Sequence, residues 1–203
     1  VPRAMHLLKR VEAIFRNLIP SFDVMETMRP ADFLEFREQL KPASGLQSLQ
    51  FREIEYICGL RDERYLSLQD ETVRDRLRAR LDEPSLWDAF LTLMDRYELP
   101  RDTDEAVIES LIKVMRDPDR HPLSPLVDQL IAFDELFGLW RTRHVQMVMR
   151  MIGAKPGTGN VSVGKLVEKG YPPMGHGGVD YLRTTLSKSF FPLLWEARTF
   201  IER

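Results

Sequence analysis

The sequence LVDQLIAFDELFGLWRTRHVQMVMRM, residues 126–151, decides the fold of this chain. Apolar side chains recur in it at alternating steps of four and three, which places them on one stripe of a long α-helix. The members of the stripe are Leu126, Leu130, Phe133, Phe137, Trp140, His144, Met147 and Met151. The spacing predicts one long helix that buries this face.

His144 is the only member of the stripe that is not apolar. An unpaired buried polar group costs roughly 1–3 kcal/mol, so the imidazole needs a residue, a water or a metal as its partner. A histidine satisfied within the core is the common case. Here, however, Trp140 lies one turn earlier, the stripe offers phenylalanines and methionines, and Arg141 and Arg143 flank it. These surroundings suit a flat apolar cofactor with carboxylates, such as heme. Because no C-x-x-C-H motif occurs, such a heme would be bound without covalent attachment.

The rest of the chain also has helical periodicity, and no segment shows the sustained alternation of a β-strand. Helical spacing runs from Leu7 to Ile19, and Pro30 and Pro84 suit the first turns of helices. A last helix is predicted over Pro192–Ile201. The other predicted helices span residues 47–60, 70–81, 84–98, 102–116 and 123–153. An all-α helical bundle that forms one domain, residues 1–203, follows.

The composition excludes several classes of protein. With 203 residues, 43% of them hydrophobic, the chain can bury one substantial core. A net charge of −2 and interleaved acidic and basic residues argue against a nucleic-acid partner. No apolar run approaches the roughly 18–20 residues that span a bilayer, so we expect no membrane insertion. The single Cys58 forbids an internal disulfide, fits a cytoplasmic location and is expected to be a packed thiol.

A second informative stretch is SGLQSLQFREIEY, residues 44–56, in which a loop leads into a helix. Phe51 faces inward at helical spacing, and Arg52 lies beside that face. The guanidinium could pair with Glu53 or Glu55 on the surface. Alternatively, it is a fork aimed at a ligand carboxylate, with Phe51 as the apolar wall beside it.

The stretch 153–178, GAKPGTGNVSVGKLVEKGYPPMGHGG, interrupts the helical pattern where the His144 helix ends. A glycine-rich backbone can approach a ligand closely and offer N–H donors, and a surface loop is the simpler alternative. It is not a phosphate loop, because Leu166 follows Gly164-Lys165 and no strand precedes it. His176 lacks neighbouring ligands at metal-binding spacing, so it is a weak metal candidate.

Together these stretches resemble the tryptophan 2,3-dioxygenase family. LFGLWRTRHVQMVMRMIGAKPGTG, residues 136–159, is similar to the family's heme-ligand helix and the Gly-Thr-Gly loop after it. SGLQSLQFREIEYICG, residues 44–59, is similar to its substrate-binding helix. Weaker similarity extends through residues 22–40, 84–94 and 179–199, so the resemblance covers nearly the whole chain in the family's order.

The resemblance implies a role for each candidate residue. His144 would be the axial ligand of a b-type heme, the metal ligand of the site, with Trp140 next to it. Arg52 would bind the carboxylate of the amino acid, Phe51 would pack against its aromatic ring, and Thr158 would contact its ammonium and carboxylate end. The family opens the indole ring of L-tryptophan with O2, and both oxygen atoms enter the product, N-formylkynurenine, in the first step of tryptophan catabolism by the kynurenine pathway. It also implies a homotetramer.

Two features differ from the family's pattern. The chain starts at Val1 inside a predicted helix, and we interpret it as a fragment that lacks the family's N-terminal segment. In the family, that segment carries a distal histidine. His6 does not match it, so we assign no distal base. The stretch 160–178 is also roughly fifteen residues longer than usual for the family. The longer stretch leaves open a related heme-dependent monooxygenase that acts on tyrosine or another indole. The missing segment leaves open a heme-binding or purely structural helical protein without turnover.

Overall fold

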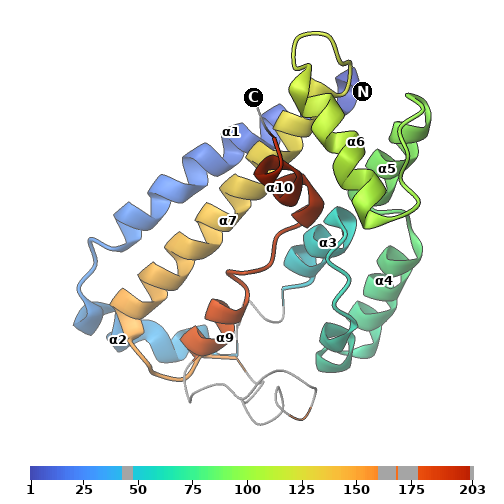
Figure 1. Cartoon of the computed structure of the whole chain (residues 1–203). Helices are drawn as coiled ribbons and strands as arrows, with labels where there is room; N and C mark the ends of the chain where they lie inside the picture. Colours follow the sequence, from blue (N-terminus) through green and yellow to red (C-terminus); the bar gives the residue numbers. More distant parts are fainter. Residues whose placement is uncertain (43–47, 160–167, 169–177, 202–203) are drawn as a thin grey trace.

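The computed structural model describes residues 1–42, 48–159, 168 and 178–201, and α7 (Ser124–Ile152) is its longest helix (Figure 1). The other helices are α1 (Pro2–Met25), α2 (Pro30–Arg37), α3 (Leu49–Cys58), α4 (Glu71–Asp82), α5 (Leu86–Asp95), α6 (Asp104–Arg116), α9 (Gly178–Thr184) and α10 (Pro192–Thr199), with short 3-10 helices η1 (Glu38–Leu40) and η3 (Glu63–Leu68). No strand occurs in the described residues. The predicted all-α class is therefore confirmed.

Local capping explains where several helices begin. Ser48 accepts a hydrogen bond from the backbone of Phe51 at the start of α3, and Asp70 does the same for α4. Helix α5 begins after Ser85, which forms a capping box with Asp88, so the prediction of Pro84 in its first turn was wrong. Pro192 opens α10 as predicted, although α10 ends at Thr199 rather than at residue 201.

Glycine ends the two helices that matter most for the site. Gly59, with φ of 115°, terminates α3, and its amide bonds to the carbonyl oxygens of Glu55 and Tyr56. Gly153, with φ of 58°, terminates α7. Positive φ is strained for other residues, so glycine fixes both ends.

Helix α1 lies beside α7 and runs in the same direction (Figure 1). The contacts advance together along both helices: Gln129 donates to Glu12 at one end, and Phe22 lies 6.1 Å from the ring of His144 further along. Near the far end, Arg150 pairs with Glu26. One side of the candidate site is therefore covered by the C-terminal half of α1.

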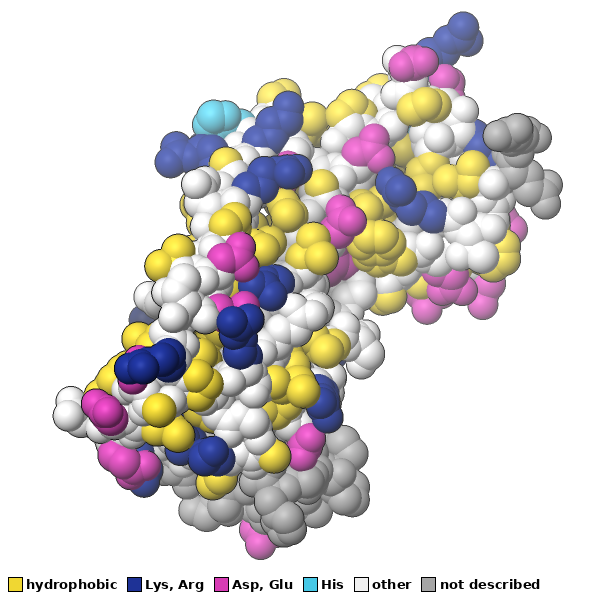
Figure 2. Space-filling model, turned by 90° about the vertical axis from the view of Figure 1, so that its left-hand side faces the viewer, with side chains coloured by type: hydrophobic (Ala, Val, Ile, Leu, Met, Phe, Trp, Pro, Cys, Tyr) yellow, Lys and Arg dark blue, Asp and Glu magenta, His cyan; other side chains and the backbone are white. Residues whose placement is uncertain are grey.

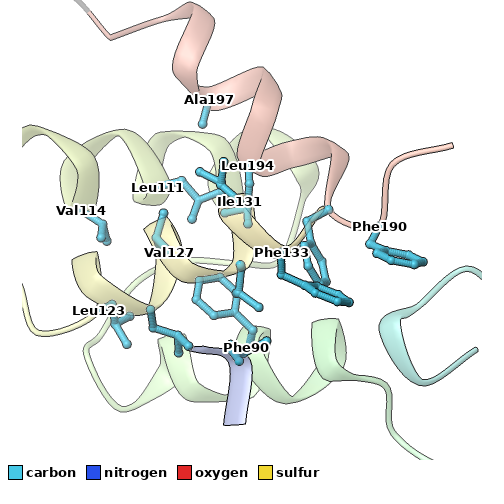
Figure 3. Packing of buried hydrophobic residues seen from close by; sticks show 14 of the residues in the cluster. Phe90, Leu111, Val114, Leu123, Val127, Ile131, Phe133, Phe190, Leu194 and Ala197 are labelled. Carbon is cyan, nitrogen blue, oxygen red and sulfur yellow. The ribbon is translucent and has the colours of Figure 1, made fainter. Parts of the chain in front are cut away.

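The hydrophobic core gathers around the N-terminal half of α7. Figure 3 shows Val127, Ile131 and Phe133 of α7 facing residues of α5, α6 and α10, among them Phe90, Leu111 and Leu194. Asp134, 6% exposed, fastens the C-terminal segment to α7 by accepting hydrogen bonds from the backbone of Phe190 and Phe191 and from the indole of Trp195. This packing leaves the C-terminal half of α7 for other contacts.

The surface is mixed in charge. On the face that Figure 2 shows, basic and acidic side chains lie among hydrophobic ones. None of the helices in the described ranges is both long enough and apolar enough to cross a membrane.

Candidate active site

A cavity of about 340 Å³ opens where α3, the C-terminal half of α7 and α9 meet. Of the site residues predicted from the sequence, Phe51, Arg52, Trp140 and His144 all line it. The other lining residues are Ser48, Gln50, Ile54, Arg141, Val145, Tyr181, Leu182 and Thr185. The two stretches that carry the family resemblance thus meet at one cavity.

His144 lies half-buried between aromatic rings. Its ring stacks on Trp140 with 5.4 Å between centroids and on Phe22 with 6.1 Å. Burial lowers the pKa of His144 below its ordinary value of 6.5, so the imidazole is neutral at neutral pH. A neutral imidazole beside an apolar cavity is the form that ligates a metal.

These residues fit a b-type heme. If the protein binds heme, His144 would supply the protein ligand to its iron. The walls beside His144 are aromatic and aliphatic, which suits a flat apolar group. Within the described ranges, no cluster of three or more His, Cys, Asp or Glu side chains could hold a bare metal ion.

Arg52 is more deeply buried than the sequence indicated, with 2% of its surface exposed. It pairs with Glu55, but this pair is buried rather than on the surface. Its Nη2 donates a long bond of 3.4 Å to the hydroxyl of Tyr181, and its guanidinium carbon lies 3.6 Å from the ring centroid of Tyr65. The guanidinium is therefore fixed on several sides at the wall of the cavity, where an anionic ligand would meet it.

Phe51 forms the aromatic wall next to Arg52. Its ring lies 5.8 Å from Trp140 and 5.7 Å from Phe137, and the Arg52 guanidinium carbon is 4.8 Å from its centroid. The ring planes are tilted by 31° relative to Phe137 and by 36° relative to Trp140, so the three rings form one apolar surface against which a planar ring would pack. This aromatic wall therefore contains side chains from both α3 and α7.

Thr158 is half-buried and is not among the described residues that line the cavity. A hydrogen bond from Arg37 to the carbonyl oxygen of Pro156 holds the segment before Thr158 in place. The contact between Thr158 and substrate stays a prediction. Most of the glycine-rich stretch, including Lys165 and His176, lies outside the described residues.

Three buried groups were not predicted as site residues: Tyr181, which lines the cavity, and Glu55 and Tyr65, which contact residues that line it. Glu55, 2% exposed, pairs with Arg52 and also with Arg141 at 2.9 Å. Tyr181 reaches the hydroxyl of Tyr65 at 2.5 Å. The spacing of Arg52 and Glu55 on one helix was a usable signal, whereas the tyrosine pair joins residues 116 positions apart and has no local signature.

The two arginines next to His144 in the sequence have different surroundings. Arg141 lines the cavity, but Arg143 pairs with Asp23 of α1 at 2.5 Å and with Glu26, directly after α1, at 3.4 Å. The sequence placed both beside a cofactor. In the structure, Arg143 instead fastens the end of α1 to α7.

Comparisons with known proteins agree on one family. A family model described as tryptophan 2,3-dioxygenase matches residues 2–97 and 88–201. A tryptophan 2,3-dioxygenase of a Nocardioides species is 43% identical over 200 residues, which cover 97% of this chain and 69% of that protein. Tryptophan 2,3-dioxygenases of Herpetosiphon aurantiacus and Caulobacter vibrioides are 40% and 35% identical; the matches cover 97% and 98% of this chain and 74% and 76% of those proteins.

Proposed function

Because the chain belongs to the tryptophan 2,3-dioxygenase family, a family of oxidoreductases, we propose that it uses a b-type heme to open the indole ring of L-tryptophan with O2, giving N-formylkynurenine. One observation carries the proposal. His144 and Trp140 from α7, and Phe51 and Arg52 from α3, line the same cavity. Membership of an enzyme family argues against a helical protein without turnover. We also propose that the protein is cytoplasmic and assembles as a homotetramer, in line with its family.

His144 holds the cofactor in this proposal. Burial keeps its imidazole neutral, and the stacked rings of Trp140 and Phe22 fix its orientation. When bound, heme supplies the redox-active iron that makes O2 reactive toward an electron-rich indole. The apolar wall around His144 keeps bulk water away from that reaction.

Arg52 and Phe51 bind and orient the substrate. A charge-assisted fork from Arg52 to the carboxylate contributes on the order of 1.5–3 kcal/mol. The ring of Phe51 offers a flat face to the indole, next to Trp140 at 5.8 Å. Two anchors on adjacent residues of α3 hold the amino-acid end and the ring together, which aligns the reacting carbon atoms with the cofactor side of the cavity.

The first test removes the imidazole that would hold the heme. We expect His144→Ala to abolish heme retention, because the described cavity wall offers no second imidazole. Optical spectra of the purified, heme-reconstituted protein measure this. His6→Ala is the matched control, since His6 is exposed on α1. A heme spectrum in His144→Ala equal to that of the control would remove the central assignment.

The second test identifies the reaction. With isotopically labelled O2 and L-tryptophan, mass spectrometry should find two labelled oxygen atoms in a ring-opened product. A product with one labelled atom would instead favour the related monooxygenase, and tyrosine as a parallel substrate would show whether the preference lies with indoles. Arg52→Leu is expected to weaken the use of L-tryptophan at least about tenfold with its heme spectrum unchanged.

A further inference from the structure

Glu55 is a buried carboxylate shared by two arginines at the wall of the cavity. One of its oxygens, Oε2, accepts from Arg52 on the same helix, and the other, Oε1, accepts from Nη2 of Arg141 at 2.9 Å. The exposed fractions of the three side chains are 2% for Glu55, 2% for Arg52 and 3% for Arg141. Burying three charges is costly, so the arrangement contributes little stability by itself.

Arg52 and Arg141 are the charged side chains among the described residues that line the cavity, and both pair with Glu55. The buried carboxylate of Asp134 also acts on Arg141 through its charge. The two guanidinium groups give the cavity wall donors for an anionic group, and Glu55 fixes where these donors lie.

Glu55 also connects the two halves of the site. Arg141 lies one turn before His144 on α7, and its Nη1 donates to the carbonyl oxygen of Lys188 at 2.5 Å. Its Nε has no partner among the described residues, so Glu55 and Lys188 fix the guanidinium. A chain of contacts therefore runs from Arg52 on α3 through Glu55 to Arg141 on α7.

We propose that Glu55 is a positioning residue that, through Arg141, fixes the Arg52 guanidinium at a set distance from His144. This inference rests on the proposed function, in which Arg52 receives the substrate carboxylate. A shift of about 1 Å at such a fork is enough to lose orientation between substrate and reacting group. Glu55 is not among the described residues that line the cavity, so in this proposal it acts through Arg52.

The experiment shortens Glu55 without removing its charge. Glu55→Asp keeps the carboxylate but withdraws it by one methylene, so that it cannot reach both arginines. Since the net charge is unchanged, any effect reports position rather than attraction. We expect KM for L-tryptophan to rise about tenfold with a smaller change in kcat. Calorimetric titration should show the same loss of affinity for L-tryptophan, but unchanged affinity for 3-methylindole, which has the ring without the carboxylate.

The matched control is Glu53→Asp. Glu53 lies on the same helix, is 7% exposed, and pairs with Arg76 at 2.8 Å and Arg80 at 3.5 Å, neither of which lines the cavity. A general loss of packing would affect both variants alike and would lower affinity for L-tryptophan and 3-methylindole together. If Glu55 has a positioning role, only Glu55→Asp loses affinity, and it loses affinity for L-tryptophan but not for 3-methylindole.

Arg141→Lys is a second variant in case Glu55→Asp fails to fold. It keeps the positive charge on α7 but replaces the fork with a single ammonium, and we expect about a threefold rise in KM for L-tryptophan with the heme spectrum unchanged. A folded, heme-loaded variant with wild-type KM and wild-type affinity for L-tryptophan would overturn the positioning role alone. Absence of heme binding and tryptophan turnover in the wild-type protein would overturn the proposed function and this inference with it.

Discussion

The two halves of α7 have the same apolar spacing but different surroundings. In the N-terminal half, Phe133 and Phe137 are 5% and 2% exposed and contact side chains from α1 and from the segment before α10. In the C-terminal half, Trp140 and His144 are half-buried and line a cavity of about 340 Å³. One stripe on one helix therefore supplies both the core and the site, and only the elements packed against it decide which.

The difference has a physical origin in what fills the space opposite the stripe. Phe190, Phe191 and Leu194 close over the first half and leave little room, as Figure 3 shows for Phe190 and Leu194. Opposite the second half, α3 contributes Phe51 and Arg52, whose side chains line the cavity and do not fill it. We therefore expect substitutions in the first half to change stability and those in the second half to change binding.

The largest expected effect is that of Phe133→Ala. The ring of Phe133 stacks on Phe190 at 5.6 Å with 9° between planes and contacts Phe15 at 6.2 Å, so its removal leaves a cavity inside the core. We expect the free energy of unfolding to fall by about 3–5 kcal/mol. Urea denaturation followed by circular dichroism measures this. A loss below about 1 kcal/mol would show that the first half of α7 is no better packed than the second.

Trp140→Ala is expected to have a smaller effect on stability and a larger one on binding. Because Trp140 is only half-buried, its removal should lower the free energy of unfolding by about 1–2 kcal/mol. It removes the ring that stacks on His144 at 5.4 Å and faces Phe51 at 5.8 Å, so both cofactor retention and affinity for L-tryptophan should fall. Heme titration and the urea experiment, run in parallel with Phe133→Ala, compare the two halves directly. Equal loss of stability in the two variants would contradict the division.

The sequence predicted the stripe because helical periodicity is a local property. It predicted the all-α class, the position of α7 and helices over residues 47–60 and 70–81, where α3 and α4 lie, for the same reason. It placed Phe51, Arg52, Trp140 and His144 at one site because two long motifs resemble one family. Each of these predictions uses only residues that lie close together in the sequence.

Contacts between distant residues were not predictable in this way. The hydroxyl pair of Tyr65 and Tyr181, and the bond from Arg141 to Glu55, depend on how α3, α7 and α9 pack. The same holds for Asp134, whose position in the stripe region gives no hint that it receives the backbone amides of Phe190 and Phe191. Periodicity states which face of a helix is buried, but not which partner covers it.

Ionisable groups extend the comparison, and the effect expected for Cys58 is absent at neutral pH. Cys58, 4% exposed, belongs to the packed core, whereas His144 lies beside the cavity. Burial favours the neutral form of both side chains, so it shifts their pKa values in opposite directions. It lowers the pKa of His144 and raises the pKa of Cys58 from 9.0 to about 12. The thiol should therefore matter only in alkaline solution.

Whether stability rises or falls with pH depends on whether the folded or the unfolded chain loses the Cys58 proton first. As the pH rises above 9.0, the unfolded chain ionises at Cys58 while the folded chain keeps the thiol until about pH 12. The stability that the thiol contributes is thus fully present below pH 9 and is lost toward pH 12, with a slope of at most about 1.4 kcal/mol per pH unit. Because tyrosines titrate in the same range, the measured quantity is the difference in unfolding free energy between wild type and Cys58→Ala. This difference should be constant from pH 7 to about 8.5 and decline at higher pH; a constant difference up to about pH 10.5 would place Cys58 in contact with solvent instead of in the core.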